Sequence, residues 1–195
     1  MSKRRYRSVS VNSLDWSWLC DQVDGERIVV GIDVAKVDQF AAVMRPDLSV
    51  VQTVRWKQPH EQADFVGLVD ELASRASSLV VVMEPSGVYG DTVRHALLED
   101  DIQVFRVNPK RAHDAAEVYD GVPSRHDAKA AAIIAKLHLD GASEPWPMRS
   151  DHERRLHAQL RILTVYTKEY KRNRDRLESL LSRYWPWTGR PPRAS

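Results

Sequence analysis

Apolar positions along the first two thirds of the chain fall into strand-like runs and helix-like stripes. Short β-rich runs occupy residues 27–34, 39–44 and 50–56, with turn residues between them, and predict three strands of an antiparallel meander. Apolar residues spaced three and four apart over 60–74 then predict a helix with one buried face.

The pattern continues with an apolar run at 79–84, which is typical of a strand buried on both faces. Four more elements are expected after it: a helix over 89–98, a strand over 102–107, a helix opened by Pro109, and a helix that Ser124 could cap and that reaches Leu139. Three meandering strands followed by alternating helices and strands are the order of a ribonuclease-H-like fold, although other α/β layouts share it. We therefore expect an α/β fold with a mixed sheet flanked by helices.

The last third of the chain has a different period. Residues 151–184 contain neither proline nor glycine and predict one long helix. Its apolar stripe repeats with alternating spacings of four and three, the pattern of a coiled coil. The stripe, called the seam below, consists of Leu156, Leu160, Leu163, Thr167, Tyr170, Arg174, Leu177, Leu181 and Tyr184. An amphipathic helix folded back on the body would use the same stripe.

These patterns divide the chain into five segments. We expect a polar, irregular extension over 1–26, an α/β domain over 27–142, a linker over 143–150, a basic coiled-coil helix over 151–184 and a disordered tail over 185–195. Within the extension, Trp16, Trp18 and Leu19 are possible anchors for a short helix.

The composition excludes several classes of protein. Hydrophobic residues make up 43% of the chain, which argues against wholesale disorder. No apolar run approaches the ~20 residues needed to span a bilayer, and no secretory signal follows the basic start. The single cysteine, Cys20, excludes an internal disulfide. We expect a cytoplasmic protein that makes no membrane contact.

Charge is distributed unevenly along the chain. From Arg149 onward there are 12 Lys/Arg and 5 Asp/Glu, whereas residues 1–148 hold 17 Lys/Arg and 22 Asp/Glu. A basic arm on an acidic body favours a polyanion partner at the arm, although a solvated coiled-coil surface would have the same composition. The candidate nucleic-acid contacts are Arg161, Lys168, Lys171, Arg172, Arg174 and Arg176.

Three acidic residues are placed where catalytic carboxylates could gather. Asp33 lies in the otherwise apolar first strand, Glu84 ends the most apolar strand, and Asp127 falls in the first turn of a predicted helix. Carboxylate oxygens suit Mg²⁺ or Mn²⁺. Taken singly, the first two could be strand-end turn residues, and Asp127 could be a helix-start acid favoured by the dipole. The seven histidines show no zinc-ligand spacing, and no phosphate-binding glycine loop is present.

Four motifs occur in order along the chain: Gly31–Lys36, Val82–Tyr89, Val107–Lys110 and Ser124–Ala131. Together they resemble the DEDD transposases of the insertion-sequence one-ten (IS110) type, relatives of the Piv invertase. The resemblance covers roughly residues 27–184. It implies a RuvC-like nuclease domain in which an Asp, a Glu and two further Asp hold Mg²⁺.

Carried onto this chain, the resemblance assigns Asp33, Glu84 and Asp127 as metal ligands and catalytic residues. The fourth acid is expected three residues after Asp127, where this chain has Ala130. An alternative register places Ser124 third and Asp127 fourth. One acid is absent in either register, so we expect Mg²⁺ or Mn²⁺ to bind weakly and little DNA cleavage to occur.

The resemblance also implies partners. DNA and a structured guide RNA are expected, together with homo-oligomerisation through the coil. Family members share a carboxy-terminal domain with a nucleophilic serine, which we expect this sequence to be without. The leading interpretation is therefore a truncated or catalytically impaired transposase. A non-enzymatic nucleic-acid-binding dimerisation module and a standalone junction-resolving nuclease are the alternatives.

Overall fold

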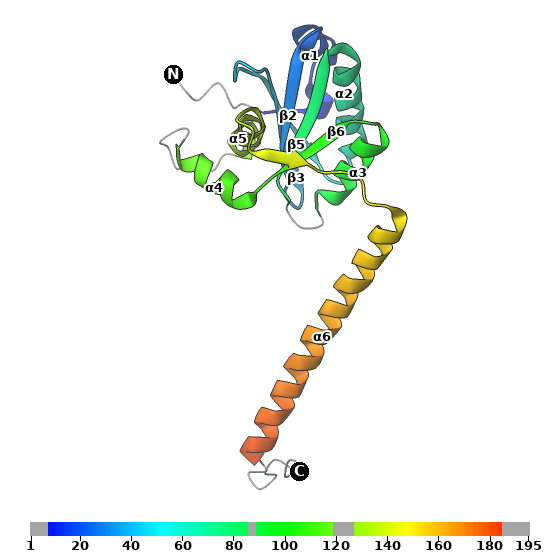
Figure 1. Cartoon of the computed structure of the whole chain (residues 1–195), viewed down its shortest axis with the longest axis vertical. Helices are drawn as coiled ribbons and strands as arrows, with labels where there is room; N and C mark the ends of the chain where they lie inside the picture. Colours follow the sequence, from blue (N-terminus) through cyan, green and yellow to red (C-terminus); the bar gives the residue numbers. More distant parts are fainter. Residues whose placement is uncertain (1–7, 86–88, 119–126, 185–195) are drawn as a thin grey trace. The chain divides into compact units, whose positions relative to one another are not determined.

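The computed structural model of the chain describes residues 8–85, 89–118 and 127–184 (Figure 1). It divides into two compact units, Met1–Met148 and Arg149–Ser195. The first contains a mixed sheet with helices on both faces, and the second contains the long helix α6 (Asp151–Tyr184). The expected fold class, a mixed sheet flanked by helices and followed by a long helix, is confirmed.

Within the described residues the sheet has seven strands in the order β1-β4-β3-β2-β5-β6-β7. Their bounds are β1 (Val9–Ser10), β2 (Arg27–Asp33), β3 (Asp38–Met44), β4 (Val50–Lys57), β5 (Ser78–Met83), β6 (Gln103–Val107) and β7 (Ser143–Pro145). The strands β2, β3 and β4 form the antiparallel meander that the alternating pattern predicted. On the other side of β2, β5 and β6 run parallel to it, as strands joined by crossover helices do.

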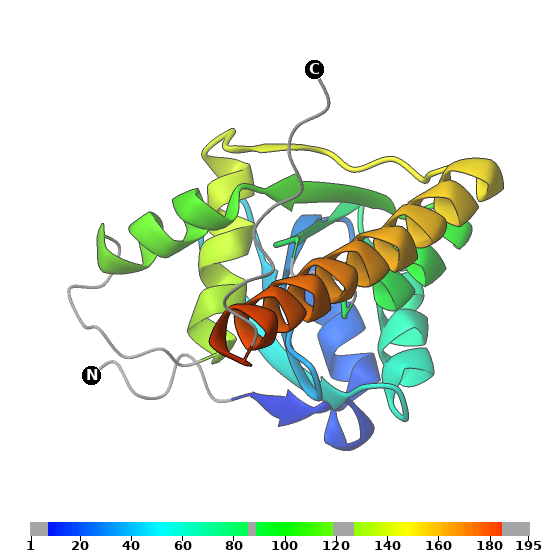
Figure 2. The ribbon, with the colours of Figure 1, turned by 90° about the horizontal axis from the view of Figure 1, so that it is seen from below.

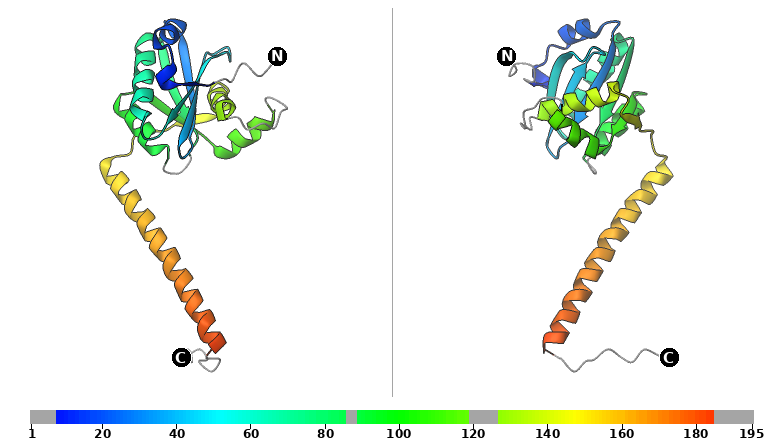
Figure 3. Two further views of the ribbon diagram at one scale, coloured as in Figure 1. Left: turned by 180° about the vertical axis from the view of Figure 1, so that it is seen from behind. Right: turned by 60° about the vertical axis from the view of Figure 1, so that its left-hand side comes forward.

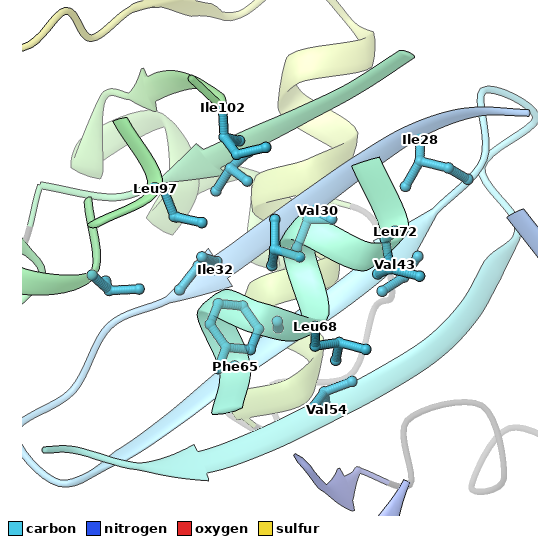
Figure 4. Packing of buried hydrophobic residues seen from close by; sticks show 14 of the residues in the cluster. Ile28, Val30, Ile32, Val43, Val54, Phe65, Leu68, Leu72, Leu97 and Ile102 are labelled. Atoms are coloured by element: carbon cyan, nitrogen blue, oxygen red, sulfur yellow. The ribbon is translucent and has the colours of Figure 1, made fainter. Parts of the chain in front are cut away.

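Helices cover the two faces of the sheet. One face is packed by α1 (Trp16–Val23), α2 (Gln62–Arg75) and α3 (Asp91–Glu99), and the other by α4 (Pro109–Val118) and α5 (Asp127–Leu139), which lie side by side (Figures 2 and 3). This double cover explains why β5 is apolar from Leu79 to Met83. In Figure 4, Ile32 of β2, Phe65 of α2 and Leu97 of α3 meet on the first face, with α5 behind the sheet.

The expectation of an irregular amino-terminal extension over 1–26 was wrong for part of that segment. Val9 and Ser10 pair in parallel with β4, and Leu19, Cys20 and Val23 of α1 are buried in the core. The Asp15 side chain caps α1 by accepting a hydrogen bond from the Trp18 amide at 3.0 Å. The short helix expected near Trp16, Trp18 and Leu19 is thus present as α1, whereas only tertiary contacts distinguish the two residues of β1 from a loop.

The expectation of a linker over 143–150 was wrong for its first residues. Ser143–Pro145 form β7, which pairs antiparallel with β6, and the Trp146 amide donates to the Val104 carbonyl at 2.8 Å. Trp146 also packs under the Arg94 guanidinium, which lies 4.5 Å from its ring centroid. Proline is tolerated here because β7 is at the sheet edge, where its missing N–H breaks no ladder.

Helix α6 spans the range that the second period predicted. It opens with a capping box, in which Glu153 Oε2 accepts from the Ser150 amide at 2.8 Å and Ser150 Oγ accepts from the Glu153 amide at 3.3 Å. No residue of α6 is buried within this single chain. None of the described helices combines the length and apolarity that a bilayer crossing requires. The predicted cap at Ser124 and the predicted tail 185–195 lie outside the described residues.

Candidate active site and nucleic-acid interface

Two of the expected metal ligands lie at the ends of neighbouring strands. The parallel ladder between β2 and β5 ends with the pair Ile32 and Met83, and the next residues are Asp33 and Glu84. Adjacent strands are about 5 Å apart. The sheet therefore brings two residues that are distant in sequence to the same carboxyl edge, where α/β sheets present functional side chains.

Asp33 is on the face of the sheet that α5 covers. It pairs with Phe40 of β3, and directly opposed residues in an antiparallel ladder point to the same face. Phe40 packs in the cluster formed by the helix α5 residues Ala131 and Ala135. Asp33 is half-buried there.

A close approach at Gly31 fixes the position of α5. A Cβ atom built on Gly31 would overlap the carbonyl oxygen of Ala131 and lie 2.6 Å from the amide nitrogen of Ala135. Residues two apart in a strand share a face, so this contact is on the same side of β2 as Asp33. The absence of a side chain at Gly31 and the small alanines of α5 together allow the helix to touch the strand backbone.

The carboxyl end of α5 lies toward β6 on the same face of the sheet. His138, near the carboxyl end of α5, meets Phe105 of β6 edge-on, with ring centroids 4.6 Å apart. The earlier part of the helix packs against β2 and β3. The amino-terminal turn therefore lies on the β2–β3 side. Asp127 is the first residue of this turn, four residues before Ala131, and its side chain is outside the described part of the structure.

The surroundings of Glu84 are suited to a cation. Partial burial raises the pKa of the Glu84 carboxyl, and the charge of His113 on α4 acts in the opposite direction. A carboxylate removed from water is stabilised by a positive charge beside it, and its oxygens are the donors that Mg²⁺ and Mn²⁺ prefer. The carboxylates of Asp33 and Glu84 therefore fit a divalent ion. No cluster of three or more His, Cys, Asp or Glu side chains capable of holding a metal occurs among the side chains described.

Ala130, which stands where the fourth acid was expected, is half-buried in the second turn of α5 between the buried residues Lys129 and Ala131. Residues three apart share a helix face, so Ala130 lies on the same side of α5 as Asp127. An aspartate at this position would keep part of its carboxylate in contact with water.

His113 was not expected from the sequence. The sequence indicated only that His113 lies on the helix that Pro109 opens, four residues after that proline and on the same side of the helix. Its proximity to Glu84 depends on the packing of α4 against α5 and the sheet, and could not be inferred locally.

The basic residues of α6 fall into two groups. Lys168, Lys171, Arg172 and Arg176 line one shallow surface hollow together with Asp175 and Ser179, here called the basic face. At 100° per residue, Arg161 and Arg172 lie about 160° and about 180° around the helix from Leu163 of the seam. Lys168 lies about 140° and Lys171 about 80° from Leu163, so the basic face is centred on a different side of α6 from the seam and Lys171 lies at the border between them.

Arg174 does not belong to the basic face. It is a seam position, and its guanidinium pairs with Asp175 at 3.1 Å and with Glu178 at 3.6 Å. Arg172 has an intrahelical partner too, Glu169 at 2.7 Å, but it remains on the basic face. Exposed pairs of this kind are weak, so Arg172 can exchange its partner for a phosphate.

Comparison with known proteins gives several similarities. Thermus thermophilus RuvC in complex with a Holliday junction substrate is similar over 62% of this chain and 99% of that chain, with 15% identity and a TM-score of 0.44. A second Thermus thermophilus RuvC structure has 15% identity, a TM-score of 0.43 and coverage of 61% and 99%. The ethanolamine utilization protein EutJ from Carboxydothermus hydrogenoformans covers 46% of this chain and 39% of its own, with 10% identity and a TM-score of 0.33. None of the curated proteins matches the chain.

The sequence itself carries a family signature. A family profile described as a transposase, that of the IS110-type DEDD transposases, matches residues 30–186. The match includes most of the body of the sheet and all of α6, together with the positions of Asp33, Glu84 and Asp127. Because the family profile matches well over half of the chain, the chain belongs to the IS110-type DEDD transposase family.

Proposed function

We propose that this chain is the nuclease-fold part of a DNA transposase in which Asp33, Glu84 and Asp127 hold a divalent ion, Mg²⁺ or Mn²⁺, with reduced affinity. The observation that carries the proposal is the β2–β5 ladder, whose last pair, Ile32 and Met83, is followed directly by Asp33 on one strand and Glu84 on the other. The contact between Gly31 and α5 supports it, because it brings the helix that begins with Asp127 onto the same face.

The residues of this site have separable roles. Asp33 and Glu84 supply negative charge from the rigid strand ends, and Asp127 adds a ligand from the helix start. A bound divalent ion supplies positive charge that activates water and stabilises the charge developing on a phosphodiester. Ala130 lacks the carboxylate that would complete the set, so fewer ligands hold the ion and cleavage is impaired.

Restoring the acid tests this proposal. The substitution Ala130→Asp is expected to raise Mg²⁺ and Mn²⁺ affinity, and Asp33→Asn in that background is expected to abolish the gain. A ligand that binds only the native state stabilises it by about 2.7 kcal/mol at one hundred times its Kd. Thermal unfolding with and without each metal measures this shift.

Asp100→Asn is the matched control, because Asp100 is an exposed carboxylate at the far end of α3. It should leave the metal-induced shift unchanged. If the Ala130→Asp protein unfolds at the same temperature with and without metal, the metal site is wrong. The chain would then be a non-enzymatic module that binds nucleic acid and assembles through α6.

We further propose that the basic face of α6, with Arg161, binds the phosphates of DNA or of a structured guide RNA. Its support is the clustering of Lys168, Lys171, Arg172 and Arg176 on one side of the helix. The seam remains available for pairing with a second copy of the chain, since it lies on a different side of the helix. One copy of α6 could then bind nucleic acid through the basic face while its seam pairs with a second chain.

Nucleic-acid binding through this face should depend steeply on salt. If about five phosphates are neutralised, the logarithm of affinity for duplex DNA falls against the logarithm of salt concentration with a slope near −4.5. Charge reversal at Lys171 and Arg172 should weaken binding to all sequences alike and make the slope less steep. Fluorescence anisotropy over a salt series measures both quantities.

Arg172→Gln and Arg174→Gln form a matched pair, two residues apart on different sides of α6. Only Arg172→Gln is expected to weaken binding clearly, because Arg174 lies in the seam with two acidic partners. Equal losses in both variants, or binding that ignores salt, would contradict an interface at the basic face.

A further inference from the structure

A buried amide lies directly behind the candidate metal site. Gln39, the second residue of β3, has only 1% of its surface exposed. Its Oε1 accepts a hydrogen bond from the Ala35 amide at 3.2 Å, and its Nε2 donates to the Ala35 carbonyl. Because a backbone N–H must meet the oxygen and a backbone carbonyl must meet the nitrogen, these two bonds fix the orientation of the amide. Gln39 thus holds the backbone two residues after Asp33 at two points.

The Gln39 amide is the centre of a wider network. Its Nε2 also donates to Gln58 Oε1 at 3.0 Å, and Gln58 Nε2 donates in turn to Gln62 Oε1 at 3.1 Å and to Thr92 Oγ1. Thr92 Oγ1 in turn donates a hydrogen bond to Gln62 Oε1 at 3.0 Å, so the side chains of Gln58, Gln62 and Thr92 are all bonded to one another. The Gln58 backbone amide adds a bond to the Val37 carbonyl at 2.9 Å. The loop after Asp33 is therefore tied to β4, to the start of α2 and to the start of α3.

The same network joins the loop after Asp33 to the helix that follows Glu84 in the chain. The loop over 34–37 follows Asp33 directly, and Thr92 is the second residue of α3, the helix reached after Glu84. Close packing reinforces this link, since a Cβ atom on Gly90 would lie 3.3 Å from Val34 and 3.2 Å from Met83. The amides and this packing connect the residues that flank Asp33 and Glu84.

We propose that Gln39 is a positioning residue for the metal site, which sets the place of the Asp33 carboxylate relative to that of Glu84. This inference rests on the proposed function, in which both carboxylates hold the ion. Divalent Mg²⁺ requires oxygen ligands at well-defined positions, so freedom of one ligand lowers its affinity. Hydrogen bonds behind the ligands supply this restraint in metal sites.

The proposal requires the amide group, because only an amide can accept from Ala35 N–H and donate to two carbonyl oxygens at once. A leucine at position 39 would fill the volume with apolar atoms and make none of the three bonds. Ala35 is exposed and Gln58 is only half-buried, so water can satisfy the freed backbone groups of Ala35 and the freed Oε1 of Gln58, and the loop would lose its restraint. The chain is therefore expected to fold with a looser site.

Mn²⁺ titration calorimetry on the full chain carrying Ala130→Asp tests this inference. Adding Gln39→Leu should weaken Mn²⁺ binding by about tenfold or more, the usual loss when a group supporting a ligand is removed. Gln58→Leu and the exposed Thr92→Val remove outer bonds of the network and should each weaken binding less. Gln52→Leu, at a half-buried glutamine of β4 whose side chain bonds only to the neighbouring Thr53 carbonyl, is the control and should bind as the parent does.

Titrations run well below the unfolding temperature distinguish positioning from stability, since a folded protein with an intact site keeps its Kd even when less stable. Asp33→Asn is included to separate the two proposals. If it abolishes binding and Gln39→Leu binds as the parent does, the positioning role is wrong and the metal site stands. If Asp33→Asn has no effect, or if no protein binds Mn²⁺, the metal site is wrong and the inference is overturned with it. If Gln39→Leu does not fold, unchanged binding by both Gln58→Leu and Thr92→Val overturns the positioning role.

Discussion

Replacing Gly31 by alanine is expected to destabilise the protein by about 3 kcal/mol or more, although it adds a single methyl group. The new Cβ would overlap the Ala131 carbonyl oxygen and lie 2.6 Å from the Ala135 amide nitrogen. Both are backbone atoms within α5, so no side-chain rotation can relieve the clash. The helix must move away from β2 or the strand must bend. Either change also displaces the turn that begins with Asp127.

Gly67→Ala is the matched control for this prediction. Gly67 is an exposed interior residue of α2, and an added Cβ would lie 3.8 Å from Trp16, an ordinary contact distance. Alanine is a better helix former than glycine by about 1 kcal/mol, so this variant should be more stable than the parent. Urea unfolding midpoints compare the two variants. A Gly31→Ala protein as stable as the parent would show that α5 does not touch β2 as described.

Aspartate at both Leu160 and Leu163 is expected to abolish self-association of the chain. Both leucines belong to the seam and are 50% and 61% exposed in the single chain. Burial of each against a partner helix would contribute roughly 1.5–3 kcal/mol, whereas a buried unpaired carboxylate opposes pairing. Thr167 and Arg174 interrupt the seam and should limit the stability of the pair while fixing its register.

Val165→Asp is the control for this second prediction, since Val165 is 60% exposed and lies about 180° around the helix from the seam residue Leu156. It should leave the association unchanged. Sedimentation equilibrium at micromolar concentration distinguishes monomer from oligomer in all three proteins. A parent chain that sediments as a monomer, or a Val165→Asp protein as impaired as the double variant, would show that the seam is not an interface.

Local patterns were sufficient for most of the regular elements. The strands predicted over 27–34, 39–44 and 50–56 agree with β2, β3 and β4 to within a residue or so at each end. Alternation and apolar runs report on elements whose faces are buried, because most buried positions are apolar. The long helix was equally clear, because its 34 residues contain no proline or glycine and the three-and-four spacing of its apolar residues repeats many times.

The same patterns failed for β1 and β7, which have two and three residues, whereas the short helix expected near Trp16, Trp18 and Leu19 is present as α1. Segments this short contain too few positions to show a period. They are ordered by partners distant in sequence, as when Val9 pairs with Val54 or Phe105 with Pro145. Propensity alone assigns such residues to loops.

The sequence by itself identified the candidate residues: carboxylates in apolar surroundings at Asp33 and Glu84, and basic residues along the final helix. It also indicated that the two acids end strands of one sheet. Only the tertiary structure decided that the two strands end at the same level of the sheet, that Gly31 lets α5 approach, and that Gln39 hydrogen-bonds to the loop after Asp33. These contacts join residues that are far apart in the chain or depend on the fold around them. Their energies depend on distances of a few tenths of an ångström, which no one-dimensional pattern specifies.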